Sequence, residues 1–111
     1  MAWLVHDGAV LASVETAGSR RERRRGLLGR DGIDGVLRLP ARSVHTVGMR
    51  FPIDVAFCRP VGPDGLRVVR IVTVPRNRVT RPCVRGRIAL EAEAGSFRRW
   101  GVRPGARLEV R

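Results

Sequence analysis

The sequence predicts a mainly-β fold, a single compact antiparallel β-sandwich or small barrel. It also predicts one short helix near residues 20–28 and a helical turn near residues 97–100. Seven short runs of strand-forming residues are separated by Gly- and Pro-containing turns, and they do not alternate with long helices. An antiparallel sandwich or closed sheet is the stable way to bury such strands. The length of 111 residues suits one domain, which we expect to span residues 1–111.

The first two strands form a predicted hairpin. Residues 2–6 and 9–14 are apolar runs joined by Asp7-Gly8, and this dipeptide favours a tight turn because both positions need positive φ. Ser19 and Glu22 then form a capping box that opens the helix. The helix is expected to end at Gly29, with Leu27 and Leu28 as its apolar anchors.

The remaining strands are marked by turns and alternation. Residues 36–39 form a short strand, and residues 53–58 and 66–74 form a second hairpin. Residues 76–86 suggest a loop or a weak edge strand. In residues 87–93, the alternation places Glu91 and Glu93 on one face and the apolar residues on the other. A helical turn capped by Ser96 and a final strand at residues 106–110 complete the chain.

Composition is that of a folded but very basic protein. The chain is 43% hydrophobic, carries a net charge of +12, and all 22 of its basic residues are arginine. Arginine binds phosphate and carboxylate groups well, so non-specific contact with nucleic acid is one interpretation. The wide spread of the arginines favours the alternative, a basic surface without a specific partner.

Neither a cofactor nor a metal is indicated. Cys58 and Cys83 are isolated from other ligand-type residues and are expected to be buried free thiols. The glycine-containing segments match neither a P-loop nor a dinucleotide fingerprint. The first apolar run is too short for a signal peptide, and no run has membrane-spanning length, so a cytoplasmic location is expected.

The stretch from residue 44 to residue 57 gathers the most varied side chains next to apolar core. Asp54 lies inside an apolar strand and therefore needs a partner, for which Arg50 is the nearest candidate. One hypothesis is structural: Asp54 either pairs with Arg50 or accepts hydrogen bonds from backbone amides, and so fixes the turn that leads into the strand. The other makes Asp54 the floor of a pocket walled by His45, Thr46 and Met49.

Three further features have both a functional and a structural interpretation. His45 could act as a base, with Asp54 or Glu91 orienting it, but a hydrogen-bonded, partly buried histidine is favoured. Glu91 and Glu93 resemble a hydrolase carboxylate pair, although exposed glutamates are the commoner pattern. The arginine-rich helix is a weak polyanion-binding candidate and is favoured as a solvated face, since no aromatic residues are interleaved with Arg20, Arg21, Arg23 and Arg24.

Three blocks of the sequence resemble the family catalogued as domain of unknown function 192. The blocks are Arg25-Gly26-Leu27-Leu28-Gly29-Arg30, the stretch His45–Phe57 with its Met49-Arg50-Phe51-Pro52-Ile53-Asp54 core, and Leu90–Gly95 followed by Trp100–Gly105. The resemblance implies a compact mainly-β, sandwich or jelly-roll-like domain with a helix near its start, and implies no established activity. Two departures from the family pattern are noted. Ala106 stands where the family has an acidic residue, and we expect no leader segment of the kind seen in many relatives.

The sequence therefore favours an uncharacterised, non-catalytic β module that binds a small polar ligand or a protein partner. The residues expected to line its cleft are His45, Thr46, Met49, Arg50, Asp54 and Glu91. The first alternative is a hydrolase or lyase-like enzyme that uses His45 with Asp54 or Glu91. The second is a basic accessory protein that binds RNA, DNA or an acidic protein through the arginine-rich helix of residues 20–25 and the loop of residues 76–87.

Overall fold

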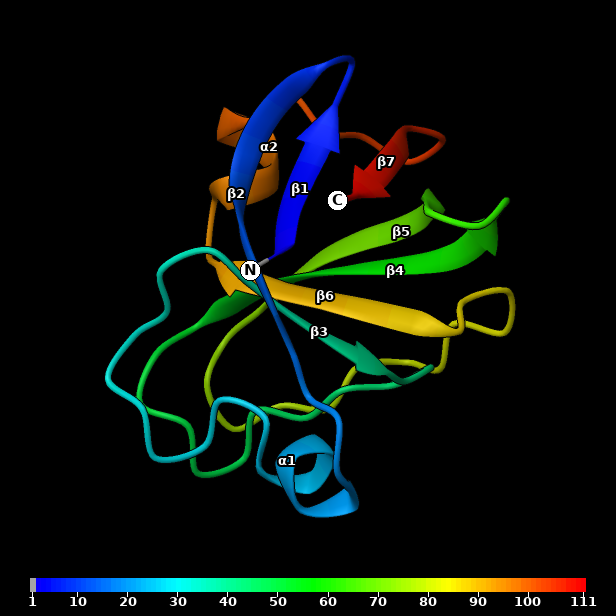
Figure 1. Cartoon of the computed structure of the whole chain (residues 1–111). Helices are drawn as coiled ribbons and strands as arrows, with labels where there is room; N and C mark the ends of the chain where they lie inside the picture. Colours follow the sequence, from blue (N-terminus) through cyan, green and yellow to red (C-terminus); the bar gives the residue numbers. More distant parts are fainter. Residues whose placement is uncertain (1) are drawn as a thin grey trace.

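Seven strands close into a β-barrel in the computed structural model (Figure 1), which describes residues 2–111, apart from the Arg24 side chain. Around the barrel the strands run in the order β1-β2-β3-β6-β4-β5-β7. The strands are β1 (Ala2–His6), β2 (Ala9–Thr16), β3 (Val36–Pro40), β4 (Ile53–Val61), β5 (Gly65–Val74), β6 (Ile88–Glu93) and β7 (Arg107–Val110). The predicted mainly-β fold is confirmed, and of the two predicted architectures the structure is the closed barrel and not the sandwich.

Both predicted hairpins are present. β1 pairs antiparallel with β2, and the connecting Asp7 and Gly8 have φ values of 50° and 79°. These positive values are those expected of a tight turn that matches the twist of its strands. β4 pairs antiparallel with β5 along their full length, from Ile53↔Val74 to Val61↔Gly65.

The β2–β3 pair differs from the antiparallel sheet that we expected, because these two strands run parallel. A parallel pair needs a long connection that returns the chain to the same end of the sheet. Residues 17–35 provide it, and they contain helix α1 (Arg20–Arg25). Figure 1 shows α1 at one end of the molecule, away from the β1–β2 hairpin and helix α2 (Ser96–Arg99).

The apolar residues form two separate cores on the two faces of the sheet. Along β4, Ala56 and Cys58 belong to the core inside the barrel, whereas Ile53, Val55 and Phe57 belong to a second core. This division follows the alternation of side chains along a strand. The second core also contains Leu27, Leu37, Leu39, Val44, Met49, Val74, Cys83 and Ala89. It therefore lies between the outer face of the sheet and the segments around α1, and this is where a pocket forms.

Helix α1 is shorter than predicted. The Ser19 hydroxyl accepts a hydrogen bond from the Glu22 N–H at 3.0 Å, as the capping box requires. The helix ends at Arg25, and the N–H of Gly26 donates to the carbonyl of Glu22. Gly26 has a φ of 49° and a ψ of −123°, a backbone conformation that glycine adopts readily. Gly26, and not Gly29, is therefore the stop signal.

Helix α2 contributes an aromatic side chain to the barrel core. Phe97 is 1% exposed within that core and packs edge-to-face against Trp100, with ring centroids 5.5 Å apart. The predicted helical turn is thus confirmed, one residue earlier than expected. Within residues 2–111, neither helix has the length and apolar character needed to cross a membrane.

Candidate functional site

Glu91 is a buried carboxyl group on the outer face of β6. It is 4% exposed, so the expectation of an exposed glutamate is wrong for this residue and correct for Glu93. Its partners across the sheet are Leu37 on β3 and Val55 on β4, both apolar residues of the second core. The cross-strand neighbours therefore offer the carboxyl group no hydrogen bond.

A pocket of about 130 Å³ lies against Glu91. Its walls come from the end of α1, the end of β3 and the segment that follows β3. The lining residues are Arg23, Arg25, Gly26, Leu27, Leu28, Leu39, Pro40, Ala41, Ser43, Val44, His45, Met49 and Glu91. The carboxyl group of Glu91 and the arginines of α1 thus border one cavity.

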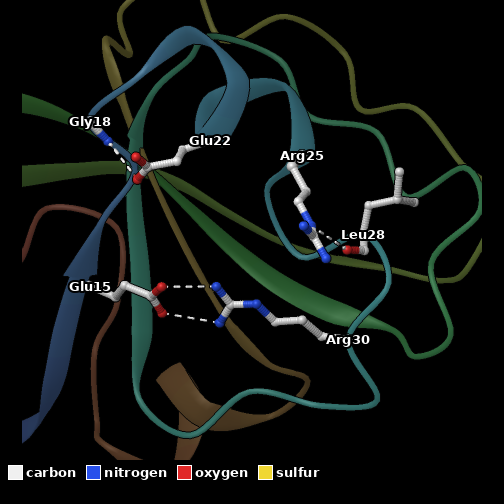
Figure 2. A network of polar contacts seen from close by, with 6 residues as sticks. All are labelled: Glu15, Gly18, Glu22, Arg25, Leu28 and Arg30. Atoms are coloured by element: carbon white, nitrogen blue, oxygen red, sulfur yellow. Dashed lines mark hydrogen bonds and ion pairs between the residues drawn. The ribbon is translucent and has the colours of Figure 1, made fainter.

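Hydrogen bonds around α1 hold one wall of this pocket in place (Figure 2). Arg30 donates to both carboxylate oxygens of Glu15 on β2, at 2.9 and 3.0 Å. Glu22 accepts from the Gly18 N–H, and Arg25 donates to the Leu28 carbonyl. A bidentate arginine–carboxylate contact fixes the relative orientation of the two groups in addition to pairing their charges. The turn after α1 is therefore tied to the barrel on one side of Gly26.

Gly26 approaches the carboxyl group of Glu91 closely. A Cβ atom at this position would lie 3.8 Å from Glu91 Oε2. This distance is an ordinary contact, so it is the positive φ of 49° that restricts substitution here. The backbone turn at Gly26 therefore lies next to Oε2 of Glu91.

The carboxyl group of Glu91 has an unusual protonation equilibrium. Burial raises the pKa of Glu91 from 4.5 to about 7, and the nearby positive charge of Arg30 opposes this rise. Oε2 is buried and has no hydrogen-bond partner within the described part of the chain. Unpartnered buried polar atoms are uncommon in folded proteins and call for an explanation. The group can accept or donate a hydrogen bond near neutral pH.

His45 and Met49 lie at the same pocket, but they differ in exposure. Met49 is 7% exposed and belongs to the second core. His45 is exposed, so the expectation of a partly buried, hydrogen-bonded histidine is wrong. Its backbone pairs with Val79, and the neighbouring Val44 and Thr46 are buried. Alternation in this extended segment turns the imidazole outward.

Thr46 is a structural residue and does not line the pocket. Its side chain is fully buried, donates to the Pro75 carbonyl at 2.6 Å and accepts from the Arg78 N–H at 3.0 Å. These bonds attach the 75–78 segment to the segment that carries His45. The hydroxyl of Thr46 is therefore already engaged in contacts within the protein.

Asp54 and Arg50 do not form the predicted pair, whereas the alternative prediction, that Asp54 accepts a backbone amide, is confirmed at Gly95. Asp54 accepts hydrogen bonds from the Thr73 hydroxyl at 2.7 Å and from the Gly95 N–H at 2.9 Å. Arg50 instead forms an exposed ion pair with Asp31, at 2.7 Å. Asp54 lies directly opposite Thr73 in the β4–β5 ladder, which supplies the nearer partner.

The six residues proposed for one cleft are therefore divided by the structure. His45, Met49 and Glu91 line the pocket. Thr46, Arg50 and Asp54 do not. Asp54 and Glu91 lie on opposite faces of the sheet, because Asp54 pairs with Ala92, the residue after Glu91. Glu93 is exposed and borders a different hollow, so the two glutamates do not form a carboxylate pair in one site.

The arginines of α1 lie partly at the pocket. Arg20, Arg21 and Arg23 are exposed, and Arg23 lines the Glu91 pocket. The side chain of Arg24, the fourth member of the predicted polyanion face, lies outside the described atoms. Sequence reasoning did not assign Arg25 and Gly26 to the site. The sequence feature that could have identified them is the block Arg25-Gly26-Leu27-Leu28-Gly29. Leu27 in this block is only 2% exposed and anchors the turn in the second core.

Comparisons with known proteins agree on the fold. A crystal structure from Sinorhizobium meliloti 1021, named a "putative transcription regulator", aligns with a TM-score of 0.74 and 27% identity, over 98% of this chain and 91% of its own. A protein of unknown function from Novosphingobium aromaticivorans DSM 12444 aligns with a TM-score of 0.74 and 19% identity, over 97% and 82% of the two chains. No curated protein sequence matches significantly. Residues 2–110 match the model of DUF192, described as "Uncharacterized ACR, COG1430", and the chain therefore belongs to this family of unknown function.

Proposed function

We propose that this protein is a non-catalytic binding protein that takes a small polar ligand into the pocket over Glu91. The observation that carries the proposal is the buried Glu91 Oε2, which has no hydrogen-bond partner among the described residues and borders the cavity. Leaving a buried polar group unpaired costs about 1–3 kcal/mol. A ligand that pairs with this oxygen would recover that free energy.

The pocket's size and charge define the ligand class. A volume of about 130 Å³ is well below that of sites that enclose a drug-sized molecule, about 300–1,000 Å³. Arg23 and Arg25 at its border favour an anionic group, whereas Glu91 needs a hydrogen-bonding group. A small hydroxy acid, or the equivalent end of a larger molecule, combines the two.

Binding is favoured over the hydrolase or lyase alternative. That mechanism needs His45 within hydrogen-bonding distance of a carboxylate that orients it. Within residues 2–111, His45 forms no hydrogen bond or ion pair with a carboxylate, and Asp54 is on the other face of the sheet. The geometry therefore supports recognition by Glu91 better than proton transfer by His45.

The test is an NMR titration of ¹⁵N-labelled protein with glycolate, lactate and acetamide. We expect glycolate or lactate to shift the amide signals around Gly26, His45 and Glu91. Glu91→Leu should weaken this binding by about tenfold or more, the effect of losing about 1.4 kcal/mol. Glu93→Gln is the matched control on the same side of β6, and it should bind within about twofold of the unmodified protein.

Circular dichroism would verify that both variants fold. Absence of localised shifts with every probe would refute the proposal, as would equal affinities of Glu91→Leu and the unmodified protein. Saturable binding of acetamide, with no binding of glycolate or lactate, would show that the arginines do not select an anion. That result would contradict the proposed ligand class.

The cytoplasm remains the proposed compartment, supported by the chemistry of the cysteines. Cys58 and Cys83 are both buried free thiols, as is usual where the surroundings are reducing. Recovery of the native protein from an extracytoplasmic fraction would contradict this assignment.

A further inference from the structure

Four arginine side chains line one open hollow that is separate from the Glu91 pocket. Arg42, Arg59, Arg85 and Arg87 border it together with Pro60 and Val84, and its volume is about 620 Å³. No acidic residue is among its lining residues. The hollow therefore concentrates positive charge at one place on the surface.

Backbone hydrogen bonds join the segments that carry these arginines. The Cys83 N–H donates to the Arg42 carbonyl at 2.7 Å, and the Arg87 N–H donates to the Cys58 carbonyl at 2.8 Å. The turn between them packs tightly, because a Cβ on Gly86 would lie 3.2 Å from Cys83 Sγ and from Phe57 Cβ. The frame of the hollow is therefore fixed by the fold.

The four guanidinium groups have no partners of their own. Within the described part of the chain, none of them forms an ion pair or a side-chain hydrogen bond, whereas Arg30 and Arg50 pair with carboxylates. Arg59 also lies opposite Arg67 in the β4–β5 ladder, and Arg67 donates to the Gly105 carbonyl. Like charges directly opposite each other are destabilising. Within residues 2–111, no carboxylate forms an ion pair with Arg59 or Arg67 to offset this repulsion.

We propose that this hollow binds the phosphodiester backbone of a nucleic acid strand. Guanidinium groups match phosphate oxygens in geometry and charge, and each contact releases a condensed counterion. The net charge of +12 attracts a polyanion from a distance, and the hollow then provides the local contact.

Strand binding fits the hollow better than recognition of bases. Its lining contains no aromatic side chain on which a base could stack. Contacts to phosphate position a nucleic acid without reading its sequence. Binding here is therefore independent of base sequence and independent of the ligand proposed for Glu91.

The test is fluorescence anisotropy with a labelled oligothymidylate of about 20 nucleotides, at salt concentrations between about 50 and 200 mM. Arg59→Gln/Arg87→Gln removes two charges from the hollow. The matched control, Arg98→Gln/Arg103→Gln, removes two charges from exposed arginines outside it. We expect the hollow variant to weaken binding by about tenfold and the control by at most about threefold. For the hollow variant, the slope of the logarithm of the binding constant against the logarithm of salt concentration should become shallower by about 1.4, which is about 0.7 for each lost phosphate contact.

A second pair in the hollow, Arg42→Gln/Arg85→Gln, should reproduce the loss and so exclude a folding defect of the first pair. Equal losses in the hollow and control variants would overturn the proposal, because the binding would then be diffuse. It would also be overturned if the unmodified protein failed to bind at low salt. Stoichiometric displacement of the strand by inorganic pyrophosphate would overturn it in favour of a small phosphate ligand. If the protein bound anionic phospholipid vesicles but not the oligothymidylate, the proposal would be overturned in favour of binding to a membrane surface.

Discussion

At the scale of single residues, the environment separates two glutamates that the sequence presents as equivalent. Glu91 and Glu93 are two positions apart on the same side of β6, yet only Glu91 is buried. Leu37 and Val55 flank Glu91 in the sheet, and the turn at Gly26 lies next to its Oε2. Loss of water makes the charged form of a carboxyl group unfavourable. The same residue type therefore has a different chemistry at each position.

Glu91 makes stability depend on pH in the direction opposite to that of a salt-bridged carboxylate. Its pKa is about 7 in the folded protein and near 4.5 when exposed to solvent. Between these values the folded state holds the proton more tightly, so stability falls as the pH rises from about 4.5 to 7. The full effect is about 3 kcal/mol above pH 7. Glu91→Gln removes it, so this variant should be more stable than the unmodified protein by about 2–3 kcal/mol near pH 8.

Urea unfolding near pH 4.5 and pH 8 measures this difference. Near pH 4.5 the two proteins should be closer in stability, since Glu91 is neutral in the folded state of both. Glu93→Gln serves as the control and should show no comparable gain at either pH, because Glu93 is exposed. A Glu91→Gln variant that is less stable by the same amount at both pH values would show that Glu91 is not held as a neutral acid.

At the scale of elements, strand β4 shows what sequence reasoning resolves and what it does not. The division of β4 into two faces follows from alternation alone, and the two cores confirm it. A backbone amide as a partner of Asp54 was one of the two predicted alternatives, but the identities of its partners were not predictable, because they depend on the register that places Thr73 opposite and on the return of the chain at Gly95. Proximity in sequence suggested Arg50, which the structure pairs with Asp31. Local sequence patterns therefore predict individual strands and helices. Contacts between those elements can be predicted only when the order and register of the strands are known.

The different roles of Asp54 and Arg50 predict unequal effects of truncation. Asp54→Ala leaves the Gly95 N–H without its acceptor and removes the bond to Thr73, so the free energy of unfolding should fall by about 2–3 kcal/mol. Arg50→Ala removes only an exposed ion pair and should change it by about 0–1 kcal/mol. Asp54→Asn retains an acceptor and should recover part of the loss. Urea unfolding of the three variants provides the measurement, and equal losses at the two positions would contradict these different roles.

At the scale of the whole molecule, the chain combines a closed barrel with a layer of loops and one helix over part of its outer face. The mainly-β fold was predictable, because turn residues and alternation marked the strands, but the choice of a closed barrel over a sandwich was left open. The arrangement of the loop layer was not predictable, because it is held by contacts between segments far apart in the sequence, such as those of Thr46 and Met49. Both proposed sites lie where segments of this layer meet the barrel. This arrangement agrees with the general placement of binding residues on loops that a rigid scaffold supports.

The two cysteines can report the opening of each layer separately. Cys58 lies in the barrel core, where burial raises the pKa of its thiol to about 12, and Cys83 lies in the second core beneath the loops. A buried thiol reacts with an alkylating reagent only when its surroundings open, and regions held by fewer contacts open more readily. We expect Cys83 to be alkylated at lower urea concentrations than Cys58. The intact protein is alkylated first and then digested, and mass spectrometry of the peptides measures modification at each cysteine. If both cysteines were instead modified at the same rate across the whole range, the barrel and the loop layer would open as one cooperative unit.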